Sequence, residues 1–133
     1  VTAANSGAAM LGAPLGNDYC LISLSDLLTP METIIKRLHA AAEGDFSIVL
    51  YNPSSKNRGD YLARACDIFL TYMSEDRPCG IVENIGRTGA NMQILTLGQL
   101  RDRKVNMFTT VFIGSSSTVR MGERLVTRRG YQL

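Results

Sequence analysis

The stretch from Phe46 to Arg58 places the strongest constraint on how this chain can fold. It opens with an apolar, β-branched run up to Tyr51, which is the pattern of a buried strand. Asn52 and Pro53 end this strand, because proline has a fixed φ, lacks an N–H and disfavours helical geometry in the residue before it. A polar segment then leads into a helical pattern. Open α/β proteins bind ligands at such turns, at the carboxyl edge of the sheet.

The remaining hydrophobic patterns extend this strand into a complete α/β domain. Two capping boxes mark helix starts, one from Thr29 to Glu32 with Pro30 at the first helical position, and one from Thr96 to Gln99. Short turns join the later strands, so we expect an α/β fold with a mixed β-sheet flanked by helices. The predicted elements are helices at 2–11, 30–43, 58–73 and 99–102, strands at 46–51, 19–24, 79–84, 91–95 and 106–114, and a hairpin of 119–121 with 124–127.

Composition excludes several classes of protein. The length of 133 residues fits one domain, and a net charge of +2 gives no reason to expect binding to nucleic acid or to a membrane. Cys20, Cys66 and Cys79 are odd in number and lack C-x-x-C spacing, which favours reduced thiols in a cytoplasmic protein and no metal site. The one histidine, His39, falls on the polar face of its helix and is expected at the surface rather than as a catalytic base.

The turns that follow the strands contain no established catalytic or phosphate-binding motif. The turn from Gly86 to Gly89 superficially resembles a phosphate loop but lacks the G-x-x-x-x-G-K-[ST] spacing, and no G-x-G-x-x-G fingerprint is present. Polar turns also follow Tyr51 and Gly114. The residues alone therefore indicate the ligand-binding half of an α/β enzyme that acts by positioning its substrates, and they assign no catalytic residue.

Several sequence blocks together resemble the tetrapyrrole (corrin/porphyrin) methylase family. The similarity extends over essentially the whole chain but corresponds only to the carboxy-terminal half of such an enzyme. We therefore expect 1–133 to be a single domain, the cofactor-side half of a two-domain methyltransferase, and the start without methionine agrees with this. The blocks are Val1–Ala4, Ala13–Gly16, Ile22–Pro30, Leu50–Arg58, Gly80–Asn84 and Thr109–Gly114.

The resemblance implies S-adenosylmethionine-dependent methylation of a corrin precursor, with S-adenosylhomocysteine as the product. The implied reaction methylates carbon 17 of precorrin-3B or cobalt-factor III, with contraction of the ring, in cobalamin biosynthesis. The family fold holds the cofactor in the cleft between two α/β domains, usually within a homodimer. The partners implied are thus a tetrapyrrole substrate and a second copy of the chain.

The resemblance also implies roles for individual residues. Asn52 replaces a methionine of the family, so its contact with the cofactor is expected mainly through the backbone, and Ile85 stands where the family commonly has a small alanine. Arg58 and Arg87 are the candidates to bind substrate carboxylates, and the alternative for each, favoured for Arg87, is a solvated side chain. The positions that match cofactor-binding residues of the family are Thr2, Ala3, Tyr51, Asn52, Ile85, Thr109 and Thr110.

Three alternatives remain open at this point. The chain could belong to a relative that methylates another tetrapyrrole, RNA or protein. The isolated chain could serve only for folding and dimerisation, because half of the cleft lies outside it. A nucleotide-binding regulatory domain built on the turn from Gly86 to Gly89 is the third.

Overall fold

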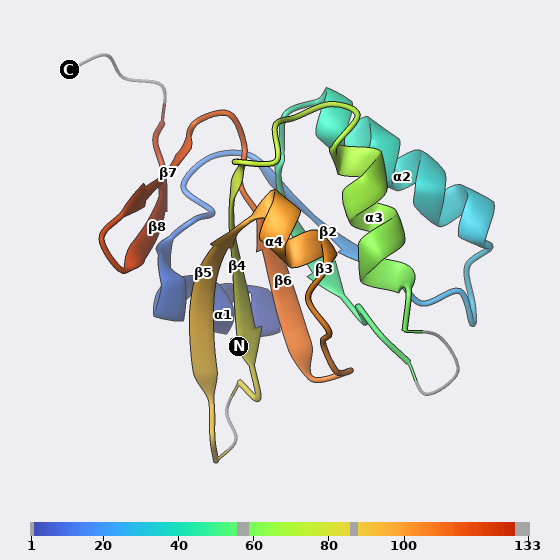
Figure 1. Ribbon diagram of the computed structural model, residues 1–133, viewed down its shortest axis with the longest axis horizontal. Helices are drawn as coiled ribbons and strands as arrows, with labels where there is room; N and C mark the ends of the chain where they lie inside the picture. The colour runs from blue at the N-terminus through green and yellow to red at the C-terminus, as the bar shows by residue number, and fades with distance from the viewer. Residues whose placement is uncertain (1, 56–58, 86–87, 130–133) are drawn as a thin grey trace.

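A five-stranded mixed sheet forms the centre of the molecule, as the sequence predicted (Figure 1). The computed structural model describes residues 2–55, 59–85 and 88–129. The strand order is β2-β3-β6-β4-β5. β2 runs parallel to β3, and β6 runs antiparallel to both of its neighbours, β3 and β4. The strands are β2 (Tyr19–Ser23), β3 (Ser47–Tyr51), β4 (Pro78–Glu83), β5 (Asn91–Thr96) and β6 (Thr109–Ile113).

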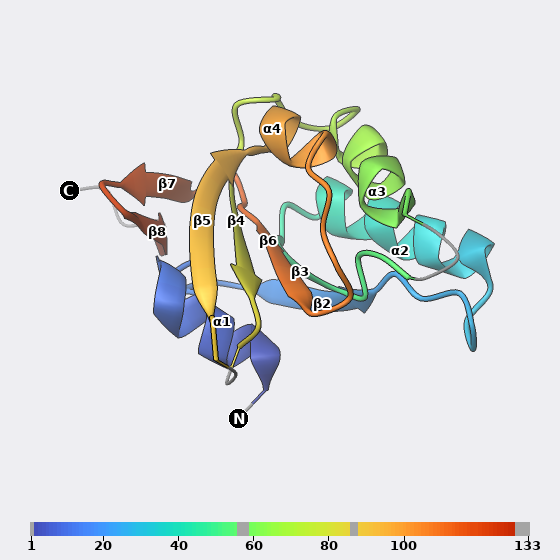
Figure 2. The ribbon, with the colours of Figure 1, turned by 60° about the horizontal axis from the view of Figure 1, so that its bottom comes forward.

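Helices cover both faces of this sheet and create two hydrophobic cores (Figure 2). On one face lie α2 (Met31–Glu43), α3 (Tyr61–Phe69) and α4 (Leu97–Arg101), and on the other lies α1 (Ala3–Leu11). Successive side chains of a strand point to opposite faces. Ile48 and Leu50 therefore join the larger core, whereas Val49 joins the core under α1. Because β3 is buried on both faces, its sequence is a nearly continuous apolar run.

A second, three-stranded sheet lies beside the first one. The predicted hairpin is confirmed as β7 (Thr118–Met121) and β8 (Arg124–Thr127), and β8 also pairs in parallel with β1 (Gly12–Ala13). β1 is absent from the predicted elements. A cluster of buried hydroxyl groups joins the sheets: the Thr127 hydroxyl lies 2.7 Å from that of Thr118 and 3.5 Å from that of Ser47 and donates to the carbonyl of Pro14.

The predicted start of α2 is wrong by one residue. Pro30 has a ψ of 141°, which is extended, so it is the cap residue and not the first helical residue. The Pro30 side chain makes no capping hydrogen bond. Thr29 lies outside the helix and forms no capping box; instead the Pro30 carbonyl accepts from the amides of Thr33 and Ile34. The box at Thr96 and Gln99 is confirmed, but it opens a helix that already begins at Leu97.

The predicted helix over 58–73 is too long at both ends. α3 begins at Tyr61, after Asp60 as its cap residue. The amides of Tyr72 and Met73 both bond to the Phe69 carbonyl, which closes a turn rather than continuing the helix. The helical spacing of apolar residues extends past the end of α3, because side chains of the turn after Phe69 also pack against the core. This spacing made the predicted helix too long.

Four observations bear on the exclusions made from composition. Within the described residues, no helix is long and apolar enough to cross a membrane. The same residues contain no cluster of histidine, cysteine and acidic side chains suited to a metal ion. The three cysteines carry free thiols, and burial raises the pKa of the Cys66 thiol to about 12. His39 lies on the outside of α2, where its Nδ1 is 2.7 Å from the Tyr72 hydroxyl.

Candidate functional site

The ends of three neighbouring strands meet at one edge of the large sheet. β3 and β4 both finish there, and β6 begins there because it runs antiparallel to both of them. In this register Glu83 pairs with Thr109, and Leu50 pairs with Val111. The turn after β3, the turn after β4 and the segment before β6 are therefore neighbours in space, although they are far apart in the sequence.

A hollow of about 250 Å³ opens at this edge, and none of the described residues that line it carries a charge. Its lining combines amide and hydroxyl groups with apolar side chains. Six of the seven positions that the family resemblance assigned to cofactor binding lie in it. The lining residues are Ala3, Tyr51, Asn52, Asn84, Ile85, Met107, Phe108, Thr109 and Thr110.

The other predicted site residues lie elsewhere or outside the described part of the chain. Thr2 does not line the hollow; it is the N-cap of α1, and its hydroxyl accepts a hydrogen bond from the Asn5 amide at 3.3 Å. An N-cap side chain satisfies one of the amides left unpaired at a helix start. Thr2 thus supports the helix on which Ala3 stands. Arg58 and Arg87 fall outside the described residues, so their assignment to substrate binding stays a prediction.

Tyr51 joins the central strand to α1. Its hydroxyl accepts a hydrogen bond of 2.8 Å from the backbone amide of Ala4, in the first turn of that helix. The first amides of a helix have no partner within it, so the phenol oxygen provides one from the sheet. The ring of Tyr51 consequently fixes the distance between the end of β3 and the start of α1, which are two walls of the hollow.

Two of the lining residues have left-handed backbone geometry. Asn52 has a φ of 54° and Asn84 a φ of 56°, and each directly follows an apolar strand. Asparagine tolerates this region better than other residues with a side chain because its short amide can bond locally. The Asn52 amide nitrogen donates to the Ser23 hydroxyl at 2.8 Å, and the backbone amide of Asn84 donates to the Phe108 carbonyl at 3.2 Å.

The segment before β6 forms the third wall and was largely missed from the sequence. The Asn106 side-chain oxygen accepts from the Phe108 amide at 2.8 Å and from the Thr109 hydroxyl at 3.2 Å. This turn holds Met107 and Phe108 at the hollow, each 45% exposed. Asn84 was missed as well. The available signal was that it ends an apolar strand in the same way as Asn52.

The remaining polar turn contributes nothing to this hollow. β6 ends at the opposite edge of the sheet, and there the Gly114 amide donates to the Pro78 carbonyl at 2.9 Å. Ser115 follows it and bonds to Thr118 in the hydroxyl cluster between the two sheets. The turn from Gly86 to Gly89, which resembled a phosphate loop, lies partly outside the described residues.

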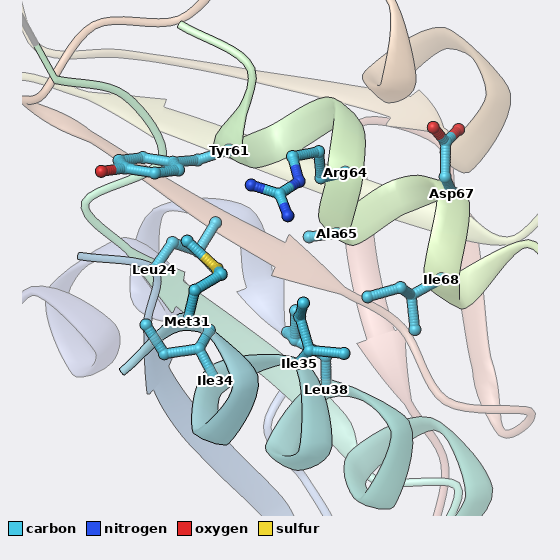
Figure 3. A pocket seen from close by; sticks show the side chains of 10 residues that line it. All are labelled: Leu24, Met31, Ile34, Ile35, Leu38, Tyr61, Arg64, Ala65, Asp67 and Ile68. Carbon is cyan, nitrogen blue, oxygen red and sulfur yellow. The ribbon is translucent and has the colours of Figure 1, made fainter. Parts of the chain in front are cut away.

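A second hollow, of about 310 Å³, lies between α2 and α3. Figure 3 shows Met31, Ile34 and Ile35 of α2 on one side of it and Tyr61 and Arg64 of α3 on the other. The Tyr61 hydroxyl donates to the Asp26 carboxylate at 2.6 Å. This groove lies between helices and away from the strand ends, and no residue assigned to the cofactor lines it. The hollow at the sheet edge is therefore the candidate site.

Comparison with known proteins identifies the family. Residues 1–101 match the family of Tetrapyrrole (Corrin/Porphyrin) Methylases. The chain is 43% identical to a probable cobalt-factor III C(17)-methyltransferase of Salmonella typhimurium, over 100% of the chain and 55% of that protein. It is 41% identical to a precorrin-3B C(17)-methyltransferase of a Sinorhizobium species, over 98% of the chain and 49% of that protein.

The fold agrees with this match. The crystal structure of the methyltransferase CobJ superposes with a TM-score of 0.87 and 35% identity, over 96% of this chain and 54% of that one. The chain thus spans about half the length of the relatives that it matches. On the combined evidence of sequence and fold, the chain belongs to the tetrapyrrole (corrin/porphyrin) methylase family.

Proposed function

We propose that the full-length protein is an S-adenosylmethionine-dependent C-methyltransferase of cobalamin biosynthesis. It methylates carbon 17 of precorrin-3B or cobalt-factor III with contraction of the ring. The names of the two curated relatives support this reaction. The observation that carries the proposal is the gathering of six of the expected cofactor residues around one hollow.

The hollow suits the nucleoside part of S-adenosylmethionine. A nucleoside is neutral and has apolar faces and polar edges. The described lining matches it, with Ile85 and Phe108 as apolar surface, and with the amide of Asn84 and the Thr109 and Thr110 segment as polar groups. No charged side chain of the described lining has to be desolvated when a neutral group enters. The amino-acid part of the cofactor carries charges and is expected to lie beyond this lining.

The chain contributes positioning rather than acid–base chemistry. Bound S-adenosylmethionine supplies an electrophilic methyl group, which a nucleophilic carbon of the substrate accepts. Alignment and exclusion of water are the main requirements of such a transfer. Tyr51 and Asn106 hold the walls of the hollow in place through the hydrogen bonds to Ala4, Phe108 and Thr109.

The substrate and the assembly are part of the same proposal. The tetrapyrrole carries several carboxylates, and arginine binds carboxylates through two parallel hydrogen bonds. We expect Arg58 and Arg87 to serve this purpose. We also expect a cytoplasmic homodimer, and analytical sedimentation of the full-length protein tests the dimer.

Titration calorimetry and a turnover assay on the full-length protein test the function. We expect S-adenosylhomocysteine to bind at one site per chain. Mass spectrometry tests precorrin-3B and cobalt-factor III as methyl acceptors, and we expect one of them to be methylated. Absence of binding to S-adenosylhomocysteine and S-adenosylmethionine would contradict the proposal. Transfer to a different tetrapyrrole, with neither precorrin-3B nor cobalt-factor III methylated, would leave the family intact but reject the substrate.

The isolated 133-residue chain is expected to show no turnover, because it spans about half of its relatives' length. A methyl-transfer assay on this chain, beside the full-length protein at equal concentration, checks that expectation. Turnover by the chain alone would show that it contains all the groups that the reaction needs.

A further inference from the structure

Two asparagines stand at equivalent places in the candidate site. Asn52 follows β3 and Asn84 follows β4, and both have positive φ angles, 54° and 56°. Backbone conformations of this kind cost energy in residues other than glycine and cluster at ligand sites. Both residues line the same hollow. Their backbones are therefore alike, and any difference in role must come from their side chains.

The two side-chain amides differ in their hydrogen bonds. The Asn52 nitrogen donates to the Ser23 hydroxyl at 2.8 Å, which fixes that amide against β2. The side-chain amide of Asn84, by contrast, makes no hydrogen bond within the described part of the chain. Its backbone N–H donates to the Phe108 carbonyl. Asn84 is half-buried. A half-buried amide without a protein partner is a group whose hydrogen bonds are left for water or a ligand.

The chemistry of the lining indicates which ligand group the Asn84 amide meets. An asparagine amide offers both an acceptor oxygen and two N–H donors. The base edge and the ribose of a nucleoside present both kinds of group. We propose that the Asn84 side chain recognises the nucleoside part of the adenosyl ligand, whereas Asn52 contributes only its backbone. This assignment rests on the proposed function and adds a specificity-determining residue to it.

Matched glycine variants of the full-length protein test the assignment. Asn84→Gly removes the side-chain amide, and Asp45→Gly is its control outside the hollow, where Asp45 also has a positive φ, of 58°. Glycine adopts the left-handed region without strain, so the backbone is preserved in each. Loss of a direct hydrogen bond should weaken S-adenosylhomocysteine binding by Asn84→Gly about three- to tenfold in titration calorimetry. Asp45→Gly should stay within about twofold of wild type, because Asp45 bonds to Ser116 and does not line the hollow. Thermal unfolding of both variants checks that they remain folded.

Two further measurements separate recognition from a structural effect. 5′-Methylthioadenosine has the same nucleoside but no amino-acid group, so Asn84→Gly should lose the same factor with it as with S-adenosylhomocysteine. Asn84→Asp keeps the shape and the left-handed tolerance of the residue but loses both N–H donors, and we expect it to bind more weakly as well. Three results would each overturn the assignment: wild-type affinity in both Asn84 variants, an equal loss of affinity in Asp45→Gly, or a loss confined to S-adenosylhomocysteine.

Binding of S-adenosylhomocysteine to the wild-type protein distinguishes a failure of the Asn84 assignment from a failure of the proposed function. If wild-type protein fails to bind S-adenosylhomocysteine, the proposed function falls. If wild type binds and both Asn84 variants bind equally well, only the role of Asn84 falls.

Discussion

Gly7 marks a close approach between α1 and the sheet, and its replacement by alanine links packing to the candidate site. A Cβ at this position would lie 2.8 Å from Phe112 Cζ and 3.2 Å from Ile85 Cδ1. Phe112 is only 1% exposed and has little room to move away. Ile85 lines the hollow. The added methyl group is therefore expected to push α1 outward or to displace Ile85.

The size of the effect follows from two opposing contributions. Alanine gains about 1 kcal/mol over glycine in a helix interior. Overpacking of a close contact costs about 1–3 kcal/mol. We expect Gly7→Ala to lower the free energy of unfolding of the full-length protein by about 1 kcal/mol, and Tm by a few degrees. Thermal and urea unfolding measure this, and calorimetry should show weaker S-adenosylhomocysteine binding through the shift of Ile85.

Asn5→Ala is the matched control in the same helix. Asn5 is exposed, and only its backbone amide takes part in the N-cap bond, so the better helix former should stabilise the protein by a few tenths of a kcal/mol. If Gly7→Ala stabilises the protein as Asn5→Ala does and leaves ligand affinity unchanged, the close contact with Phe112 does not limit the packing of α1. The reasoning would then be refuted.

Three other substitutions probe contacts that hold the site and the two sheets. Tyr51→Phe removes the bond to Ala4 and should cost about 0.5–1.5 kcal/mol in urea unfolding; an unchanged midpoint would contradict this. Thr127→Val leaves buried polar groups of the hydroxyl cluster unpaired and should cost about 1–3 kcal/mol without changing S-adenosylhomocysteine affinity. Partial burial would raise the pKa of Asp45, but the hydrogen bonds from the Ser116 hydroxyl and amide and the Arg77 charge outweigh it and lower the pKa. Its ionised form thus stabilises the fold above about pH 4, the unfolded pKa, and this stabilisation is lost as the pH falls further; Asp45→Asn should flatten that acid dependence, and an unchanged slope of stability against pH would count against it.

The fold could be predicted where burial dictates residue type. The strands β3, β4 and β6 are continuous apolar runs because they are covered on both faces. Helix ends were less predictable, since the T-x-x-E pattern at Thr29 depends on a backbone geometry that Pro30 does not adopt. β1 could not be foreseen, because two residues in a glycine- and proline-rich segment give no pattern, and their pairing with β8 is long-range.

The residues of the candidate site were proposed from the family resemblance more than from physical pattern. Ile85 and Thr109 are ordinary strand-end residues by type, and only their match to the family marked them. Met107 and Phe108 were missed, because their place depends on a turn that the Asn106 side chain organises. Asn84 could have been inferred from the residues: an asparagine that abruptly ends an apolar strand is a candidate for left-handed geometry, as Asn52 also shows.

The direction of β6 decides which polar turns reach the candidate site. β6 is antiparallel to β3 and β4, so its first residues, not its last, join their carboxyl ends at one edge. The turn at Gly114 is carried to the opposite edge, where Ser115 and Thr118 bond to each other and link the two sheets. The mixed sheet therefore separates the edge that carries the candidate site from the edge that joins the two sheets. Substitutions at Asn84 and Asn106 should change ligand affinity, whereas substitutions at Ser115 and Thr118 should change stability alone.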